Sequence, residues 1–149
     1  MKLRLAAAAL ALASAPAFAQ EADLTATGDA EAGEAAFRQC QTCHVVVNDE
    51  GETLAGRTSK TGPNLYKIAG RTAGTVEGFR YSNGLKSAAE KGLVWTEETF
   101  VPYLMDPTPW LREYLGEASA RSNMTFKVRD EEDAKNLYAY LLELAEDDD

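Results

Sequence analysis

Apolar residues at helical spacing stand out most clearly near the end of the chain. Asp130 precedes this run and three acidic residues follow it directly, which is the pattern of a helix N-cap and an acidic first turn. The pattern predicts a helix that begins after Asp130 and continues to about Ala145. The positions expected to form its buried face are Ala134, Leu137, Tyr138, Leu141 and Ala145.

Three further helices are predicted from caps and breakers. Asp29 can cap a helix from Ala30 to about Gln41, and Thr96 can cap another over Glu97–Met105. The run Asp106-Pro107-Thr108-Pro109 should interrupt that second helix, with a short helix Trp110–Leu115 ending at Gly116 after it. The side chains expected to be buried on the first of these helices are Ala32, Ala36, Phe37 and Cys40.

The middle of the chain, residues 45–92, has no such strong pattern. It is rich in Gly, Thr, Asn and Lys, and it suggests only short helices near 65–69 and 85–91. No strand pattern strong enough for a sheet is found, so the sequence predicts an all-α, single-domain protein. Because compact domains rarely hold long structureless segments, we expect a large buried cofactor to organise this part.

The first residues have the pattern of an export signal. Lys2 and Arg4 precede an apolar run over residues 5–13, and Ala17-Phe18-Ala19 is a small-x-small cleavage pattern. We expect residues 1–19 to be a signal peptide cleaved after Ala19, with residues 20–149 as the mature domain in the periplasm. The apolar run is far shorter than the roughly 20 residues that span a bilayer, and a retained N-terminal anchor is the less favoured alternative.

The charge of the mature chain narrows the choice of partners. Without residues 1–19, the 130 remaining residues carry 13 Lys and Arg against 24 Asp and Glu, a formal charge of −11. Binding to nucleic acid needs a basic face, so nucleic acid is excluded as a natural partner. Many of the acidic residues lie near the two ends, where they most simply keep the protein soluble.

The chemistry is concentrated in Cys40-Gln41-Thr42-Cys43-His44, which holds both cysteines and the only histidine of the chain. Two thiols one helical turn apart can add to the two vinyl groups of haem, and the adjacent imidazole can then bind the iron. A disulfide or redox dithiol would not need His44. A structural zinc site needs four ligands, and the two cysteines and one histidine supply only three. The motif therefore predicts one covalently attached haem c.

A second axial ligand is needed if the iron only transfers electrons. No other histidine exists, so a thioether is the remaining soft neutral ligand, and the candidates are Met105 and Met124. Met105 lies on a predicted helix, where a methionine usually packs in the core. Met124 lies in a predicted loop without an apolar neighbour before Phe126, so its position favours it as the ligand.

Many short motifs follow one another along the mature chain. They are Gly33 to Phe37, the haem motif, Thr61 to Leu65, Gly70-Arg71-Thr72, Gly78-Phe79-x-Tyr81, Gly92 to Trp95, Thr99-Phe100-x-x-Tyr103-Leu104, Ser122-Asn123-Met124-x-Phe126 and Leu137-x-Ala139-Tyr140-Leu141. This is the order found in class I cytochromes c, and the chain resembles the bacterial cytochrome c2 branch over essentially its whole mature length. The resemblance implies helices wrapped around one haem, with His44 and Met124 as the iron ligands.

The resemblance also implies roles around the ligands. The Pro63 carbonyl would accept from the His44 imidazole and fix the ring. Tyr103 and Ser122 would lie near the Met124 sulfur. The haem propionates would be held by Arg71, Tyr81 and Trp95, and the contact where the first and last helices cross would be formed by Gly33, Phe37 and Tyr140.

Two features depart from the usual pattern of this family. Residues 45–60 and 112–121 are longer than in its shortest members. The ring of lysines that many relatives place around the haem edge is also thin, because Gln39 and Thr108 stand where lysines often occur. The cationic rim expected instead consists of Arg57, Lys60, Arg121, Lys127 and Arg129.

The function implied is that of a monomeric electron carrier, not an enzyme, which takes one electron at a time from a cytochrome bc complex. Its acceptor would be a photosynthetic reaction centre or a terminal oxidase or reductase. Two alternatives remain at this stage. One is a ligand-binding or peroxidase-like haem protein whose iron is not bound by Met124, and the other is a thiol-disulfide oxidoreductase without haem.

Overall fold

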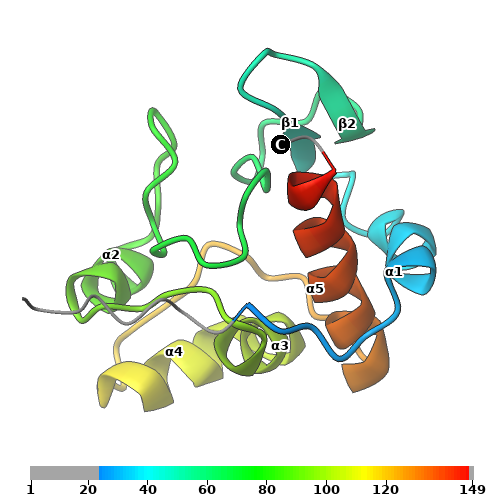
Figure 1. Cartoon of the computed structure of the whole chain (residues 1–149). Coiled ribbons are helices and arrows are strands. Elements are labelled where there is room, and N and C mark those ends of the chain that lie inside the picture. The colour runs from blue at the N-terminus through cyan, green and yellow to red at the C-terminus, as the bar shows by residue number, and fades with distance from the viewer. Residues whose placement is uncertain (1–23, 148–149) are drawn as a thin grey trace, which may run out of the picture.

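Residues 24–147 are described by the computed structural model, so the predicted signal peptide, its cleavage site and the last two residues lie outside the described part. Figure 1 shows α5 upright beside α1, with α3 and α4 below and α2 at the left. No helix within residues 24–147 is long and apolar enough to cross a membrane. The elements in chain order are α1 Ala30–Phe37, β1 Val45–Val47, β2 Thr53–Gly56, α2 Asn83–Glu90, α3 Glu97–Met105, α4 Pro107–Leu115 and α5 Glu131–Glu146.

Helix α5 has the start and the buried face that its sequence predicts. The Asp130 carboxylate accepts a hydrogen bond from the Glu132 N–H at 2.9 Å, which satisfies one of the free donors of the first turn. Three acids occupy that turn, where the helix dipole favours negative charge. The predicted face is buried except at Ala145, which is half-buried; its buried members are Ala134, Leu137, Tyr138 and Leu141.

The crossing of α1 and α5 depends on a glycine. A Cβ atom at Gly33 would lie 2.0 Å from the Asn136 carbonyl oxygen, so no other residue lets the two helices approach this closely. The Phe37 and Tyr140 rings pack beside it with centroids 5.8 Å apart. The predicted contact between the first and last helices is therefore present.

Helix α1 is shorter than predicted, since it ends at Phe37 and not near Gln41. The amide groups of Cys40 and Gln41 both donate to the Phe37 carbonyl, which turns the chain out of the helix. The expected burial was wrong for Ala32, which is exposed, and right for Phe37. The Asp29 cap is confirmed by its 2.7 Å hydrogen bond from the Ala32 N–H.

Helices α3 and α4 are separated by one residue, Asp106, and not by the whole predicted interruption. Pro107 is the first residue of α4, a position whose N–H would have no helical partner, so proline is tolerated there. Gly116 ends α4 in the left-handed conformation with φ 70°, as expected for a glycine cap. Thr96 precedes α3, and its N–H donates to the Thr99 hydroxyl at 3.0 Å.

The middle segment contains a small sheet that the sequence did not predict. Strands β1 and β2 pair antiparallel, with Val46 opposite Ala55. With three and four residues, they are shorter than typical strands, and the Val45–Val47 run has no alternation to reveal it. Helix α2 is present near the predicted position, whereas residues 65–69 form turns and no helix.

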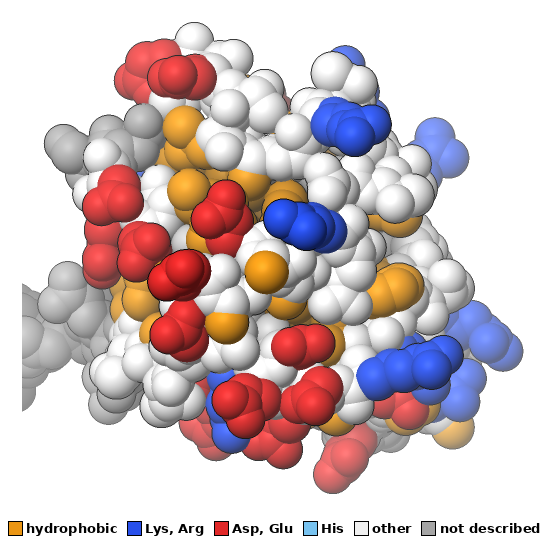
Figure 2. Space-filling view, turned by 90° about the vertical axis from the view of Figure 1, so that its right-hand side faces the viewer, with side chains coloured by type: hydrophobic (Ala, Val, Ile, Leu, Met, Phe, Trp, Pro, Cys, Tyr) orange, Lys and Arg blue, Asp and Glu red, His pale blue; other side chains and the backbone are white. Residues whose placement is uncertain are grey.

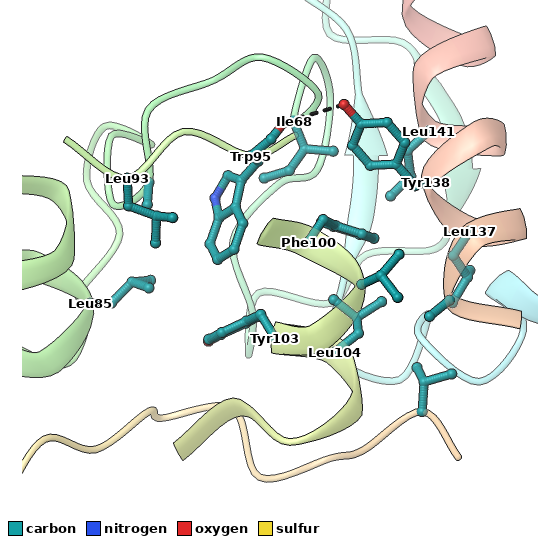
Figure 3. Packing of buried hydrophobic residues seen from close by; sticks show 14 of the residues in the cluster. Ile68, Leu85, Leu93, Trp95, Phe100, Tyr103, Leu104, Leu137, Tyr138 and Leu141 are labelled. Atoms are coloured by element: carbon teal, nitrogen blue, oxygen red, sulfur yellow. Dashed lines mark hydrogen bonds between the residues drawn. The ribbon is translucent and has the colours of Figure 1, made fainter. Parts of the chain in front are cut away.

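The core is rich in aromatic side chains that face one interior from several elements. Figure 3 shows Trp95 between Leu93 and Phe100, with Tyr103 and Leu104 on α3 and Leu137, Tyr138 and Leu141 on α5. The Tyr138 hydroxyl donates to the Trp95 carbonyl at 3.4 Å, which ties α5 to the segment before α3. This shared interior is where the candidate site lies.

Candidate haem site

A cavity of about 390 Å³ lies beside the aromatic core, and several helices and loops contribute residues to its wall. Its wall is mostly apolar, which is typical of sites that hold a large organic group. Polar and sulfur-bearing side chains from several segments interrupt the apolar wall. They include Cys40, Cys43, His44, Thr61, Arg71, Tyr81, Tyr103, Ser122, Met124 and Thr125, and Pro63 also lines the cavity.

Cys40 and Cys43 lie on the turn that follows α1, and their thiols are not joined in a disulfide. The Cys43 and His44 amides both donate to the Cys40 carbonyl, at 3.0 and 2.9 Å, so this turn directs all three side chains to the cavity wall. Burial raises the pKa of the Cys40 thiol to about 12, and the neighbouring Cys43 adds to the shift. The geometry matches two attachment points beside one ligand.

The His44 ring is fixed from two sides. Its Nδ1 lies 2.9 Å from the Pro63 carbonyl oxygen, so Nδ1 carries the proton and Nε2 is the nitrogen left to bind a metal. Burial lowers the pKa of His44, and the Pro63 carbonyl partly opposes that shift. The neutral ring that burial favours is the form that binds iron.

Gly62 is a site residue that the sequence analysis quoted only as part of a motif. A Cβ atom there would lie 2.3 Å from His44 Cε1, so the imidazole stacks directly over the glycine backbone. The Gly62 amide also donates to the Cys43 carbonyl at 2.7 Å. The sequence did offer one sign of this role, because Gly62 immediately precedes Pro63 and a glycine often marks a point where another group comes close to the backbone.

Met124 and Met105 lie in different surroundings. Met124 lines the cavity, as do the residues of the haem motif. Met105 is packed against the core cluster on α3 and is not among the cavity-lining residues. Of the two methionines, only Met124 therefore lines the cavity that His44 also lines.

The segment that carries Met124, residues 117–129 and here named the Met loop, is held by hydroxyl groups. The Ser122 Oγ accepts from the Met124 N–H at 3.0 Å and lies 2.7 Å from the Tyr103 hydroxyl. The Ser122 N–H donates to Thr108 Oγ1 at 3.1 Å. Burial raises the pKa of Tyr103, so this phenol stays protonated and able to donate.

The ends of the Met loop are anchored by residues that sequence reasoning missed. Lys127 Nζ lies 2.5 Å from Asp106 Oδ1, at the break between α3 and α4. The Val128 N–H donates to the Leu104 carbonyl, and Arg112 Nε donates to the Ala120 carbonyl at 3.0 Å. The loop is therefore attached to both helices although it has no secondary structure of its own.

Arg71, Tyr81 and Trp95, the predicted propionate partners, all line the cavity. Arg71 donates to the carbonyls of Tyr66 at 2.8 Å and Asn64 at 3.0 Å, which holds the guanidinium in place. Burial lowers the pKa of Arg71 and raises that of Tyr81. Arg71 is half-buried and has no salt bridge to any acidic residue within 24–147, so this corner of the cavity suits an anionic group brought by a cofactor.

These residues fit a haem. The cavity is large and apolar, two free thiols and a neutral imidazole lie on one wall, and a thioether lies on the same cavity. A cationic corner is available for carboxylates. The fold and the site thus define a c-type haem protein with helices around a covalent attachment motif.

Comparison with known proteins agrees with this class and narrows it. The chain is 64% identical to cytochrome c2 of Rhodovulum adriaticum over 118 residues, 79% of this chain and 94% of the relative. It is 56% identical to cytochrome c2 of Cereibacter sphaeroides over 140 residues, 93% of this chain and 92% of the relative. No protein-family model matches the chain.

Solved structures give the same result. The crystal structure of cytochrome c2 from Rhodobacter sphaeroides superposes with a TM-score of 0.78 at 58% identity, over 79% of this chain and 97% of that one. Ferric cytochrome c-550 from Paracoccus versutus gives a TM-score of 0.74 at 39% identity, over 79% and 98%.

The chain belongs to the cytochrome c2 family of class I c-type cytochromes. It is an electron-transfer protein, not an enzyme, and it carries covalent haem c. The predicted all-α class I fold is confirmed, with β1 and β2 as a small addition.

Proposed function

We propose that this protein carries single electrons through a haem c that is attached at Cys40 and Cys43 and bound axially by His44 and Met124. The observation that carries the proposal is that His44 and Met124 line one cavity while Met105 does not. Thioether and imidazole are the ligand pair of cytochromes that transfer electrons at a raised potential.

Each nearby residue of the chain has a physical task in this proposal. The Pro63 carbonyl fixes the tautomer of His44 and makes its Nε2 a stronger donor. Ser122 accepts from the Met124 N–H and contacts the Tyr103 hydroxyl, and these contacts would hold the Met124 segment so that its sulfur could serve as the second iron ligand. With both axial positions filled, the iron would be closed to substrates, and the haem would supply reversible one-electron chemistry.

The second group of residues balances charge. Arg71, Tyr81 and Trp95 form the wall at which the two propionates would be held by charge-assisted hydrogen bonds. Arg71 is positioned for this by two backbone carbonyls. Such bonds let two anions enter a chain that is already strongly acidic.

The proposed setting is the periplasm, after cleavage behind Ala19, with the mature protein as a monomer. A cytochrome bc complex would be the donor, and a reaction centre or a terminal oxidase or reductase would be the acceptor. Figure 2 shows acidic side chains mostly over the left and lower parts of the face toward the viewer, and Lys and Arg mostly toward its right side. Such a separation of charge can orient a docking encounter even when the net charge is unfavourable.

Replacing each of the two candidate methionines by alanine tests which of them binds the iron. Met124→Ala should keep the haem covalently attached, lose the weak far-red band of methionine-bound ferric haem, and bind carbon monoxide when reduced. Its reduction potential should fall. Met105→Ala is the matched control, and it should cost about 2–5 kcal/mol of packing at most while the spectrum stays unchanged.

Two results would contradict the proposal. If Met105→Ala and not Met124→Ala removes the far-red band, the ligand assignment is reversed. If the parent protein binds carbon monoxide as readily as Met124→Ala, the iron is open and a ligand-binding or peroxidase-like function is the better account. If neither result is found, stopped-flow measurements of reduction and oxidation by membranes from the source organism would identify the electron donor and acceptor.

A further inference from the structure

Four readily oxidised rings run from the cavity wall to partly exposed positions on α4. Trp95 and Tyr103 line the cavity, with centroids 4.9 Å apart. Trp110 follows on α4, 5.8 Å from Tyr103 and 6.4 Å from Trp95. Tyr114 lies one helical turn further and stacks on Trp110, with centroids 5.1 Å apart and an interplanar angle of 18°.

The series continues outward without a gap. Trp95 and Tyr103 are 5% and 6% exposed, whereas Trp110 and Tyr114 are only partly buried. The ring centroids lie at the separations of directly packed aromatic pairs, so neighbouring π-systems are close enough for an electron to pass from ring to ring. A second branch from Trp95 runs through Phe100 to Tyr138, but a phenyl ring is far harder to oxidise, and Tyr138 is fully buried. The two branches therefore differ in whether they can deliver charge to the surface.

We propose that Trp95, Tyr103, Trp110 and Tyr114, the aromatic chain, supply electrons to the haem pocket when hydrogen peroxide attacks there, and so move the oxidative damage to the surface. This function goes beyond reversible electron carriage, because the ordinary ferric state is too weak an oxidant to draw electrons from these rings. Peroxide reaches the iron in molecules in which Met124 has released it.

Reduction of one hydrogen peroxide to two waters takes two electrons and two protons. Both electrons are drawn through the aromatic chain, one after the other, so the haem centre ends in the state in which it began. Each time Tyr114 loses one electron and its phenol proton, and together these supply the two electrons and two protons that peroxide consumes. A low-molecular-weight thiol restores Tyr114 each time by giving a hydrogen atom to its oxygen, and the two thiyl radicals that result combine to a disulfide.

Lys91 at the outer end of the chain is compatible with this route. Its Nζ lies 5.1 Å from the centroid of the Tyr114 ring and donates to the Tyr114 carbonyl at 2.5 Å. A cation beside the ring disfavours a positively charged radical. Because the phenol loses its proton together with the electron, the oxidised Tyr114 is neutral, and it stays in place under the lysine.

Spin trapping tests the proposal on the ferric holoprotein. The protein is treated with hydrogen peroxide and a nitroso spin trap, adducts are located by peptide mass spectrometry, and haem bleaching is followed in the visible spectrum. The parent should carry an adduct at Tyr114. Trp110→Phe keeps an aromatic ring but removes the oxidisable indole, so it should lose the Tyr114 adduct and bleach faster. Tyr140→Phe, at the α1–α5 contact, is the control and should behave as the parent.

A second comparison separates internal transfer from direct attack by solution peroxide. On the Met124→Ala background the iron is open, so the Tyr114 adduct should increase if the oxidising equivalents come from the pocket. An adduct that persists in Trp110→Phe, an adduct that does not respond to Met124→Ala, or a parent without label at Tyr114 would overturn the proposal. Faster bleaching in Tyr140→Phe would also do so, because loosened packing would then account for it.

Discussion

A methyl group added at Gly62 would collide with the imidazole of His44. The Cβ atom of Gly62→Ala would lie 2.3 Å from His44 Cε1, 2.6 Å from Nδ1 and 2.8 Å from Nε2. Both the ring and the Gly62 backbone belong to packed segments, since the Gly62 amide is bonded to the Cys43 carbonyl. The substitution therefore has to move the His44 imidazole, which is the proposed axial ligand, or the loop that carries Pro63.

The size of the effect follows from these distances. Ordinary contact begins near 3.4 Å, so the ring must shift by about 1 Å relative to residue 62. The bond from His44 Nδ1 to the Pro63 carbonyl, now 2.9 Å long, would then exceed hydrogen-bond length. Such a bond contributes about 1 kcal/mol, which for one electron corresponds to about 40 mV. Because the bond strengthens His44 as a donor and so favours ferric iron, its loss should raise the potential by up to that amount.

Potentiometry and electron paramagnetic resonance of the ferric protein measure this effect. Gly62→Ala should show a raised potential and altered low-spin signals that report a rotated or displaced imidazole. Gly78→Ala is the control. Gly78 has φ 74° with open space around it, so alanine there should cost about 1–2 kcal/mol of stability without changing the haem signals. A parental potential and spectrum in Gly62→Ala would refute the reasoning that Gly62 fixes the His44 ring.

Four further outcomes are expected. Gly33→Ala should lower the melting temperature by about 8 °C, because overpacking of about 3 kcal/mol exceeds a helix-propensity gain of about 1 kcal/mol; an unchanged melting curve would contradict the close helix contact. Lys127→Met should weaken the far-red band on warming, as the Met loop loses its ion pair, while Lys135→Met, which breaks an ion pair on α5, should leave the band unchanged; equal behaviour of the two would deny the anchor. Cys40→Ala should give much less holoprotein by haem stain and circular dichroism, and normal yield would oppose this. Lys60→Glu should slow oxidation by an acidic-faced partner, with rates that fall as the Debye length shrinks from about 30 Å at 0.01 M salt to about 8 Å at 0.15 M; rates independent of salt would remove the docking role of the cationic rim.

The helices could be predicted where local signals dominate. Caps act within one turn of their own helix, so the sequence alone can predict them. Asp130 with its acidic neighbours and Gly116 are examples. The end of α1 was missed because the Phe37 carbonyl is shared by two amides of the haem-motif turn. That bonding is set by the turn, and the helical pattern of apolar residues runs past it.

The site could be predicted where a residue's chemistry is specific and could not where its role is positional. Cys40, Cys43 and His44, in this order and spacing, are typical of haem attachment and of few other kinds of site. Asp106 and Lys127 are ordinary surface charges in sequence, and only the fold brings them to 2.5 Å. The same fact changes the picture of the docking rim, because Lys127 is paired with Asp106 and contributes less positive charge to a partner than its sequence position suggests.

The size of the cavity gives the physical reason why the haem and the fold depend on each other. Loss of packing costs about 24 cal/mol for each Å³ of cavity, so a cavity of about 390 Å³ corresponds to about 9 kcal/mol, less where water enters. The whole stability of a domain is about 5–15 kcal/mol. The packing free energy that haem would contribute is thus comparable to the whole stability of the domain. Residues 57–82, which carry Pro63, Arg71 and Tyr81, form no helix or strand. These three residues line the cavity, so a bound haem would give the segment a surface to pack on, and a covalent link at Cys40 and Cys43 would keep the group from leaving.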